Sequence, residues 1–314
     1  MKKYLAAFMA LAMAATALTG CGGGDSAGGD DSNKTYKVAY IARAQSDSFA
    51  AWLANEMVAA ADKYDDIELK VFDGQADDAK ENAAIENAIA NGYDAIIVQP
   101  NNGEAQRPYV EKIVQAGLVA ITTNSRIEGI EGASSVDADP YNQAQVNAEL
   151  ALTQVPENAK VVVLKGPSGN FHADQRPDVQ IVGEDFANWN KDEAMALMED
   201  WTTAHGKIDA VISMNDNMAA GALEVVKGNP TYKDMLVYGV DGTAEACLLI
   251  QDGSMTATCL QSAIDLAALN LDTVHKLLTG EETQIDTDIE EVLITADNVD
   301  EYVEMYKKNG QITE

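Results

Sequence analysis

The sequence predicts an α/β protein with two lobes, each built on a doubly wound parallel β-sheet. Short apolar runs alternate with stretches whose apolar residues recur at helical spacing, from residue 37 to residue 239. This alternation is typical of parallel sheets with helices on both faces. It occurs twice, over 36–138 and again over 139–261, and a chain of 314 residues is long enough for two domains.

The first run of elements follows from its apolar periodicity. Phe49, Trp52, Leu53, Met57 and Ala61 recur on one helical face, directly after a β-rich run. Further helices are expected over 78–91 and 103–116. Strands are predicted at 37–42, 67–72, 94–98 and 118–122.

The second run restarts after Ser134. One helix is expected over 141–154, another where Ala194, Leu197, Met198 and Trp201 form an apolar stripe, and a third over 216–227. Strands are predicted at 160–164, 179–184, 208–213 and 236–239. A last apolar stripe, from Leu266 to Leu278, indicates one more packed helix.

One connection is short for a parallel crossover. Between the strands that end at Leu164 and start at Val179 lie 14 residues, Lys165 to Asp178. Such a crossover needs a dozen or more residues and usually carries a helix. Because glycine and proline occupy both ends of the connection, about two helical turns fit. We therefore expect this face of the second lobe to be thinly covered.

Residues 1–20 are predicted to be an export signal and are set aside from the fold. Lys2 and Lys3 precede an apolar stretch of about 14 residues, which is too short to span a bilayer. It ends in Leu18-Thr19-Gly20-Cys21, which resembles the lipobox of bacterial lipoproteins. The resemblance implies lipidation of Cys21 and a place on the extracytoplasmic face of the cell membrane; a plain secretory signal is the alternative. Residues 21–35, rich in glycine and aspartate, are expected to be a flexible tether.

The charge excludes several classes of function. With 51 acidic and 21 basic residues, the formal net charge is -30, so we expect no nucleic-acid binding and no membrane contact beyond the lipid anchor. Three cysteines make no disulfide framework, and Cys247 and Cys259 are expected to be buried thiols. The acidic residues between 281 and 291 lack the spacing of a calcium loop. Neither a metal nor a cofactor is expected.

Polar residues gather where the predicted strands end. In open parallel sheets, ligands bind beyond the carboxyl ends of the strands. Carboxylates, amides and guanidinium groups hydrogen-bond to hydroxyls, and aromatic rings cover the apolar faces of a sugar. Position alone leaves ordinary surface polarity as an alternative explanation. The residues in these loops include Arg43, Asp47, Phe49, Asn124, Arg126, Arg176, Trp189, Asn215 and Asp241.

Two segments carry a more specific resemblance: residues 214–222 (MNDNMAAGA) and 238–243 (YGVDGT). Weaker matches lie at 38–49, 121–124, 173–176 and 257–261. From Tyr36 to about Asn298, the chain resembles the sugar-binding lipoproteins of bacterial ABC importers, within the ribose/galactose-type periplasmic binding proteins. The resemblance implies a type I arrangement with a three-segment hinge, the lobes being 36–138 plus 262–288 and 139–261 plus 289–310. It implies a sugar ligand between the lobes, and an ABC permease with its ATPase subunits as partner.

The resemblance also assigns roles to single residues. Asp47, Asn124, Asn215, Asp241 and Gln261 fall at polar ligand contacts. Phe49 and Trp189 fall at aromatic residues that stack on the sugar, and Arg176 matches an arginine of the second lobe. Asn124-Ser125 stands where Asp-Arg is common, which makes Arg126 the candidate for the absent guanidinium. The dozen or so residues that usually follow the second-lobe arginine are missing here.

Two roles remain open from the sequence, the solute-binding subunit of an importer and a tethered sensor that presents its ligand to a signalling receptor. Both need the same site. An enzyme is not expected, because Ser168, His172 and Asp174 lie close together but no GxSxG surrounds the serine. The chain also lacks GxGxxG and GxxxxGK, so it has no phosphate-binding loop of these kinds.

Overall fold

The computed structural model describes residues 34–166 and 180–313. Several sequence-based expectations concern residues outside these ranges. They are the signal at 1–20, Cys21, nearly all of the tether, the group Ser168, His172 and Asp174, Arg176, and most of the short connection 165–178. Residues 35–314 form one compact unit.

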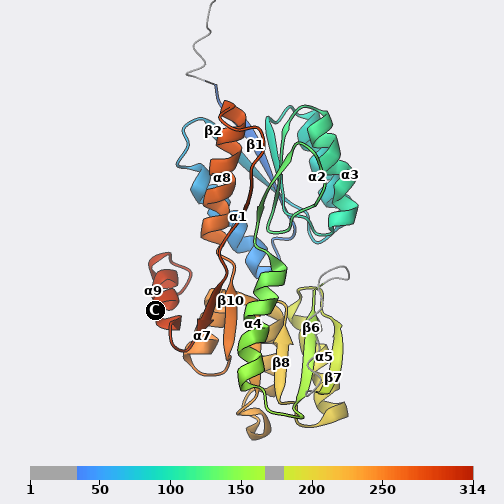
Figure 1. Cartoon of the computed structure of the whole chain (residues 1–314), viewed down its shortest axis with the longest axis vertical. Coiled ribbons are helices and arrows are strands. Elements are labelled where there is room, and N and C mark those ends of the chain that lie inside the picture. Colours follow the sequence, from blue (N-terminus) through green and yellow to red (C-terminus); the bar gives the residue numbers. More distant parts are fainter. Residues whose placement is uncertain (1–33, 167–179, 314) are drawn as a thin grey trace, which may run out of the picture. The chain divides into compact units, whose positions relative to one another are not determined.

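The first sheet contains six parallel strands in the order β11-β5-β4-β3-β1-β2. Helices α1 and α8 pack together on one face, and α2 and α3 cover the other (Figure 1). The strands are β1 (Tyr36–Ala42), β2 (Ile67–Asp73), β3 (Ala95–Val98), β4 (Val119–Thr123), β5 (Ala133–Asp137) and β11 (Asp286–Asp288). The helices are α1 (Ser48–Ala61), α2 (Asp78–Ala90), α3 (Gly103–Gln115) and α8 (Ala263–Thr279).

The second sheet also has six strands, in the order β12-β10-β9-β8-β6-β7, and only the β10–β12 pairing is antiparallel. Its strands are β6 (Lys160–Lys165), β7 (Gln180–Phe186), β8 (Ala210–Ser213), β9 (Leu236–Asp241), β10 (Ala257–Leu260) and β12 (Val292–Thr295). Its helices are α4 (Pro140–Gln154), α5 (Lys191–His205), α6 (Asp216–Val226), α7 (Ala244–Gln251) and α9 (Val299–Lys308), with a 3-10 turn at Pro230–Tyr232. The predicted fold class is therefore confirmed.

The chain passes between the two sheets three times. It crosses between β5 and α4, between β10 and α8, and between β11 and β12. Each crossing directly follows a strand, so the polar residues at these strand ends lie where the two sheets are joined.

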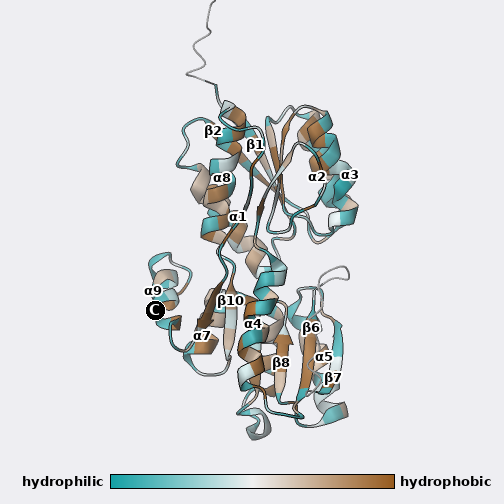
Figure 2. Ribbon diagram, in the orientation of Figure 1, coloured by the Kyte–Doolittle hydropathy of each residue, from teal (hydrophilic) through white to brown (hydrophobic). Residues whose placement is uncertain are grey.

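The predicted strands and helices match the structure to within two residues at each end. Buried strands such as β3 (AIIV) and β6 (KVVVLK) have near-continuous apolar sequences, as strands covered on both faces do. Figure 2 shows β6 and β8 coloured mostly as hydrophobic. Asp47, Asn102, Asn190 and Asn215 cap α1, α3, α5 and α6, and their side chains accept backbone N–H bonds that the helices leave open.

Strand β5 was not predicted, because its sequence (ASSVD) lacks an apolar run. All five of its residues are nevertheless buried. The hydroxyls of Ser134 and Ser135 are partnered by β11 and the residue before it: Ile285 N donates to Ser134 Oγ at 2.9 Å, and Ser135 Oγ donates to Asp286 Oδ1 at 2.7 Å. A distant segment thus makes this polar strand stable in the interior.

Strand β7, which follows the short connection, has no buried residue. The same is true of β2, the corresponding edge strand of the other sheet. The exposure of β7 therefore follows from its edge position. Whether its outer face is thinly covered remains a prediction, because residues 167–179 lie outside the described ranges.

Gly239 on β9 leaves room for the side chains of Asp216 and Met255. A Cβ at this position would overlap Asp216 Oδ1 and lie 2.5 Å from Met255 Cε. We expect Gly239→Ala to lower the free energy of unfolding by about 1–3 kcal/mol, because the buried carboxylate must move. Denaturant unfolding measures this change. Gly103→Ala, at the start of α3 with its nearest neighbour 3.8 Å away, is the control and is expected to be neutral or stabilising. Equal effects of the two substitutions would contradict this account.

Candidate functional site

The predicted polar residues lie at the carboxyl ends of strands in both sheets. Asp47 follows β1, Asn124 follows β4, Asn215 follows β8, Asp241 ends β9 and Gln261 follows β10. All are buried except Asn124, which is partly buried. Polar groups in such positions need partners or a ligand.

On the first-lobe side, Arg43 and Asp47 form an ion pair that is largely buried. Arg43 Nη2 lies 2.9 Å from Asp47 Oδ1, which also accepts the backbone N–H of Ala50 at 2.7 Å. Two polar atoms of this pair, Arg43 Nε and Asp47 Oδ2, are buried without a hydrogen-bond partner. The pair therefore retains one donor and one acceptor.

Trp189 brings an aromatic ring from the second lobe to this pair. The guanidinium carbon of Arg43 lies 5.3 Å from the centroid of the indole, within the range of a cation–π contact. The carbonyl of Trp189 accepts a hydrogen bond from Asn217 Nδ2 at 2.8 Å, which holds its backbone against α6. The indole thus lies beside the charged groups, and Gly166 packs against it.

Asp241 is the buried carboxylate of the second lobe. Its Oδ1 accepts a hydrogen bond from Gln261 Nε2 at 2.5 Å, whereas its Oδ2 is buried without a partner. Burial raises the pKa of Asp241 well above its usual range, and the charges of Asp216 and Asp47 add to this, while Arg43 and Gln261 oppose it. Asp47 and Arg43 are therefore close enough to Asp241 to act on it electrostatically.

Asp216 holds the loop that carries Asp241. Its Oδ2 accepts the N–H of Thr243 at 2.8 Å, and its Oδ1 accepts the hydroxyl of Thr258 at 2.6 Å. Burial raises its pKa to about 7, against these hydrogen bonds. The neighbouring Asn215 caps α6, and its Oδ1 accepts the backbone N–H of Met218.

Three of the predicted site residues have strained backbones. Asn124, Trp189 and Asp241 have φ angles of 66°, 62° and 117°. Positive φ is unfavourable for a residue with a side chain, most of all for tryptophan and least for asparagine. Such conformations persist only where the surrounding structure enforces them, and they gather at functional sites.

Two predicted residues take up other partners. Phe49 is 1% exposed and packs edge-to-face on Trp52 at 6.0 Å between ring centroids, so its ring belongs to the core of the first lobe. Arg126 donates through Nη2 to Asp288 Oδ1 at 2.8 Å, on β11, and its backbone N–H donates to Asp137. Its guanidinium is thereby directed to the sheet edge. Arg176 lies outside the described residues.

The described residues contain no cluster of histidine, cysteine, aspartate and glutamate that could hold a metal ion. Within the same ranges, no helix is long and apolar enough to cross a membrane. Cys247 and Cys259 are buried free thiols, and burial raises the pKa of each to about 12.

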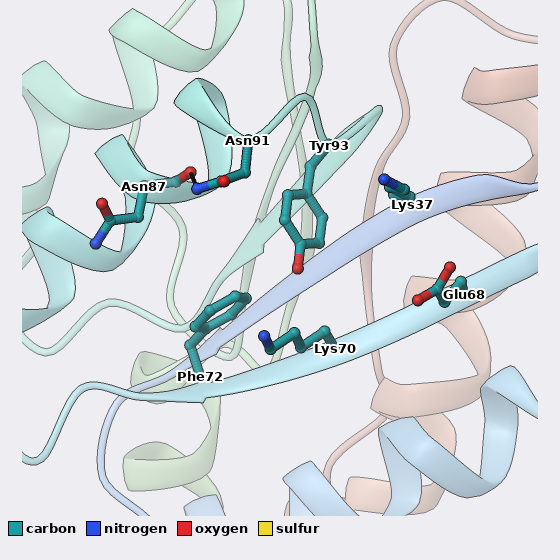
Figure 3. A pocket seen from close by; sticks show the side chains of 7 residues that line it. All are labelled: Lys37, Glu68, Lys70, Phe72, Asn87, Asn91 and Tyr93. Atoms are coloured by element: carbon teal, nitrogen blue, oxygen red, sulfur yellow. Dashed lines mark hydrogen bonds between the residues drawn. The ribbon is translucent and has the colours of Figure 1, made fainter.

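A surface hollow of about 360 Å³ lies elsewhere, on the face of β1 and β2 beside the end of α2 (Figure 3). The charged and amide side chains around it are exposed. Lys70 lies over the ring of Phe72, and Asn91 donates to the carbonyl of Asn87 at 2.7 Å. It contains none of the predicted site residues; it is lined by Lys37, Glu68, Lys70, Phe72, Asn87, Asn91 and Tyr93.

The family model of the periplasmic binding protein domain matches residues 38–282. The chain belongs to the periplasmic binding protein family. This confirms the family expected from the segments at 214–222 and 238–243.

Individual relatives match over most of this binding protein. The xylitol-binding protein of Mycolicibacterium smegmatis is 27% identical over 91% of this chain and 84% of its own length. The ribose import binding protein of Bacillus subtilis is 29% identical over 68% and 72%. A solved ABC transporter solute binding protein from Bacillus halodurans, with bound myo-inositol, is 26% identical and covers 88% of this chain and 100% of its own, with a TM-score of 0.79.

Three residues in contact with the predicted site residues were not themselves predicted as ligand contacts. Gln99 directly follows β3 and Gln143 lies in the first turn of α4; both are buried. Arg43 was noted as a loop residue only. For Gln99 and Arg43 the signal was available, since each comes immediately after a buried strand. Nothing in the local sequence distinguishes Gln143 from the other polar residues of its helix.

Gly166 is expected to control the position of the Trp189 ring. A Cβ on Gly166 would overlap the six-membered ring of the indole. Because the Trp189 backbone is held by Asn217, Gly166→Ala must rotate the side chain away from Arg43. We expect about a tenfold loss of ligand affinity in a binding titration.

The matched control is Gly183→Ala on β7, where the added Cβ would lie 2.6 Å from the indole of Trp201, away from the site. That variant is expected to lose stability with its affinity unchanged. An unaltered affinity in Gly166→Ala would show that the Trp189 ring does not contact the ligand.

Proposed function

We propose that this protein captures a monosaccharide or a related polyol between its two lobes and delivers it to an ABC permease. The observation that carries this proposal is the set of buried polar atoms without partners. Arg43 Nε and Asp47 Oδ2 come from the first lobe, and Asp241 Oδ2 from the second. Two acceptors and one donor suit a ligand with several hydroxyl groups, each of which can both donate and accept.

The aromatic ring beside these atoms supports the same ligand class. Trp189 offers a flat apolar surface next to Arg43, as a sugar ring with one apolar face requires. Two proteins similar to this chain are named for binding xylitol and ribose, and a third was solved with bound myo-inositol. All three ligands carry several hydroxyl groups. We place Arg43, Asp47, Trp189, Asn215 and Asp241 in contact with the ligand, with Asn124 and Gln261 at its edge. Phe49 forms the wall behind Asp47, and Arg126 is left out of the set.

The test is a melting-temperature panel of pentoses, hexoses, polyols and amino acids on residues 22–314, which lack the signal and Cys21. A ligand at about 100 times its Kd adds roughly 2.7 kcal/mol to the stability of the folded state. We expect a shift with at least one sugar or polyol. A shift with amino acids alone would refute the ligand class.

Asp241→Ala is expected to lower affinity for the ligand found in the panel by about tenfold to a hundredfold. A hydrogen bond to a buried charged group contributes about 1.5–3 kcal/mol, and the variant removes it. Titration calorimetry measures the change. Asp200→Ala, on the exposed side of α5, is the control and should bind as the wild type does. Near-wild-type affinity of Asp241→Ala would remove Asp241 from the site.

We further propose that the protein is exported and anchored to the membrane by a lipid on Cys21, with an ABC permease and its ATPase subunits as partners. The sequence Leu18-Thr19-Gly20-Cys21 supports this. Cys21→Ser should move the protein from the membrane fraction to the soluble extracytoplasmic fraction. Retention of this variant in the membrane would contradict lipid anchoring and leave the sugar site untouched.

A further inference from the structure

A line of side-chain amides connects the two lobes and ends on the carboxylate of Asp241. Gln99 Nε2 donates to Asn124 Oδ1 at 3.0 Å, and Asn124 Nδ2 donates to Gln261 Oε1 at 2.9 Å. Gln261 Nε2 then donates to Asp241 Oδ1 at 2.5 Å. Gln99, Gln261 and Asp241 are each at most 7% exposed.

The direction of these hydrogen bonds is set at both ends. At the first end, the backbone N–H of Arg43 donates to Gln99 Oε1 at 3.1 Å, and the hydroxyl of Tyr40 does the same at 3.1 Å. A backbone N–H can only donate, so the oxygen of Gln99 must face it and its amino group must face Asn124. At the other end, Gln261 Nε2 donates to Asp241 Oδ1, and a carboxyl oxygen that carries no proton can only accept. The two ends require the same direction.

We propose that Gln99, Asn124 and Gln261 are positioning residues that form a one-way hydrogen-bond relay, which leaves Asp241 Oδ2 as the acceptor for the ligand. The relay requires an amide at position 124. Asn124 must accept from Gln99 and donate to Gln261, which a carboxylate cannot do. The ligand contact at Asp241 rests on the proposed function, whereas the relay itself does not.

The substitution Asn124→Asp would break the sequence of donors and acceptors. The new carboxylate accepts from Gln99 but leaves Gln261 Oε1 facing another acceptor. If Gln261 turns its amide to donate to position 124, its oxygen then faces Asp241 Oδ1. In either orientation of Gln261, two buried hydrogen-bond acceptors face each other. The loss of a buried hydrogen bond in this way lowers the stability of the folded state.

A second substitution at position 241 can restore the pairing in reverse. In the double variant, Asn124→Asp with Asp241→Asn, Gln261 donates to position 124, the amide at position 241 donates to Gln261 Oε1, and the oxygen at position 241 faces the ligand. Gln143, which donates to Gln261 Oε1 at 3.1 Å in the wild type, then turns its own amide so that its oxygen accepts from Gln261. In Asp241→Asn alone, the relay keeps its direction, so the amide oxygen at 241 accepts from Gln261 and its NH₂ faces the ligand. The single variant thus presents a hydrogen-bond donor to the ligand, and the double variant presents an acceptor.

The first measurement is urea unfolding of residues 22–314, which lack the signal and Cys21, without any sugar. We expect Asn124→Asp to raise the unfolding equilibrium constant at least tenfold in the wild-type background, and by at least tenfold less in the Asp241→Asn background. Gln115→Glu, at the exposed end of α3, controls for an added negative charge and should have the same small effect in both backgrounds. Equal costs of Asn124→Asp in the two backgrounds would overturn the relay.

The second measurement is the affinity for ribose, xylitol or myo-inositol, whichever gives the largest thermal shift with the wild type. The relay predicts that Asn124→Asp weakens binding in the wild-type background and strengthens it in Asp241→Asn. Repulsion between two carboxylates would explain the first effect but not the gain. A direct contact between position 124 and the ligand would change affinity in the same direction in both backgrounds. Either of these patterns refutes the proposal.

If Asn124→Asp does not fold alone, Gln261→Glu replaces it, since a glutamate there can accept from Asn124 but cannot donate to Asp241. Asp241→Asn must then rescue its folding, and failure of rescue would refute the relay. If none of ribose, xylitol and myo-inositol binds, the comparison of the unfolding equilibrium constants of the variants still tests the relay. The lack of binding then counts against the proposed function only.

Discussion

The hydrogen bond from Asn124 to Gln261 joins the two halves of the site, and the bond from Gln261 to Asp241 extends it to the buried carboxylate. Gln261 lies where the chain leaves the second sheet for α8, so its partners come from three directions. Its oxygen accepts from Asn124 at the end of β4 and from Gln143 on α4, at 2.9 and 3.1 Å. One amide therefore connects two of the three crossings with the strand end that carries the buried carboxylate.

The strength of this arrangement comes from burial. A carboxylate removed from water is costly unless hydrogen bonds and opposite charge compensate it. Asp216 is compensated within the second lobe by Thr243 and Thr258, whereas Asp241 has one bonded oxygen and depends on Arg43, across the site, for opposite charge. Asp216 thus fixes the loop, and Asp241 retains one oxygen, Oδ2, that has no hydrogen-bond partner. The two neighbouring carboxylates have different environments and therefore different tasks.

The sequence predicted the fold class and most strand and helix positions up to β9, because buried parallel strands have apolar runs that stand out from their neighbours. It missed β5, whose serines are partnered by β11 far along the chain, and it predicted none of β10, β11, β12, α7 and α9. For the site, the ends of the strands indicated Asp47, Asn124, Asn215 and Asp241, of which Asn124 and Asp241 are connected by hydrogen bonds through Gln261. The pairing of Arg126 with Asp288, 162 positions away, could not be predicted, because no local pattern links them. The burial of Phe49, in contrast, agrees with its place in the apolar stripe that predicted α1.

The distribution of unpaired atoms between the lobes has a consequence for specificity. A ligand that reaches Asp47 and Arg43 but lacks a hydroxyl at Asp241 leaves a buried carboxylate oxygen without a partner. Such an omission costs more than the loss of a methylene group from an apolar contact, because the desolvated group has no alternative partner. Selection among ligands should therefore depend more on the arrangement of their hydroxyl groups than on the size of their carbon skeleton. It also requires both lobes, since a ligand bound to one lobe alone satisfies only part of the set. The crossing that begins at Gln261, and the Asn124 amide bonded to it, thus contribute to the selection as well as to the fold.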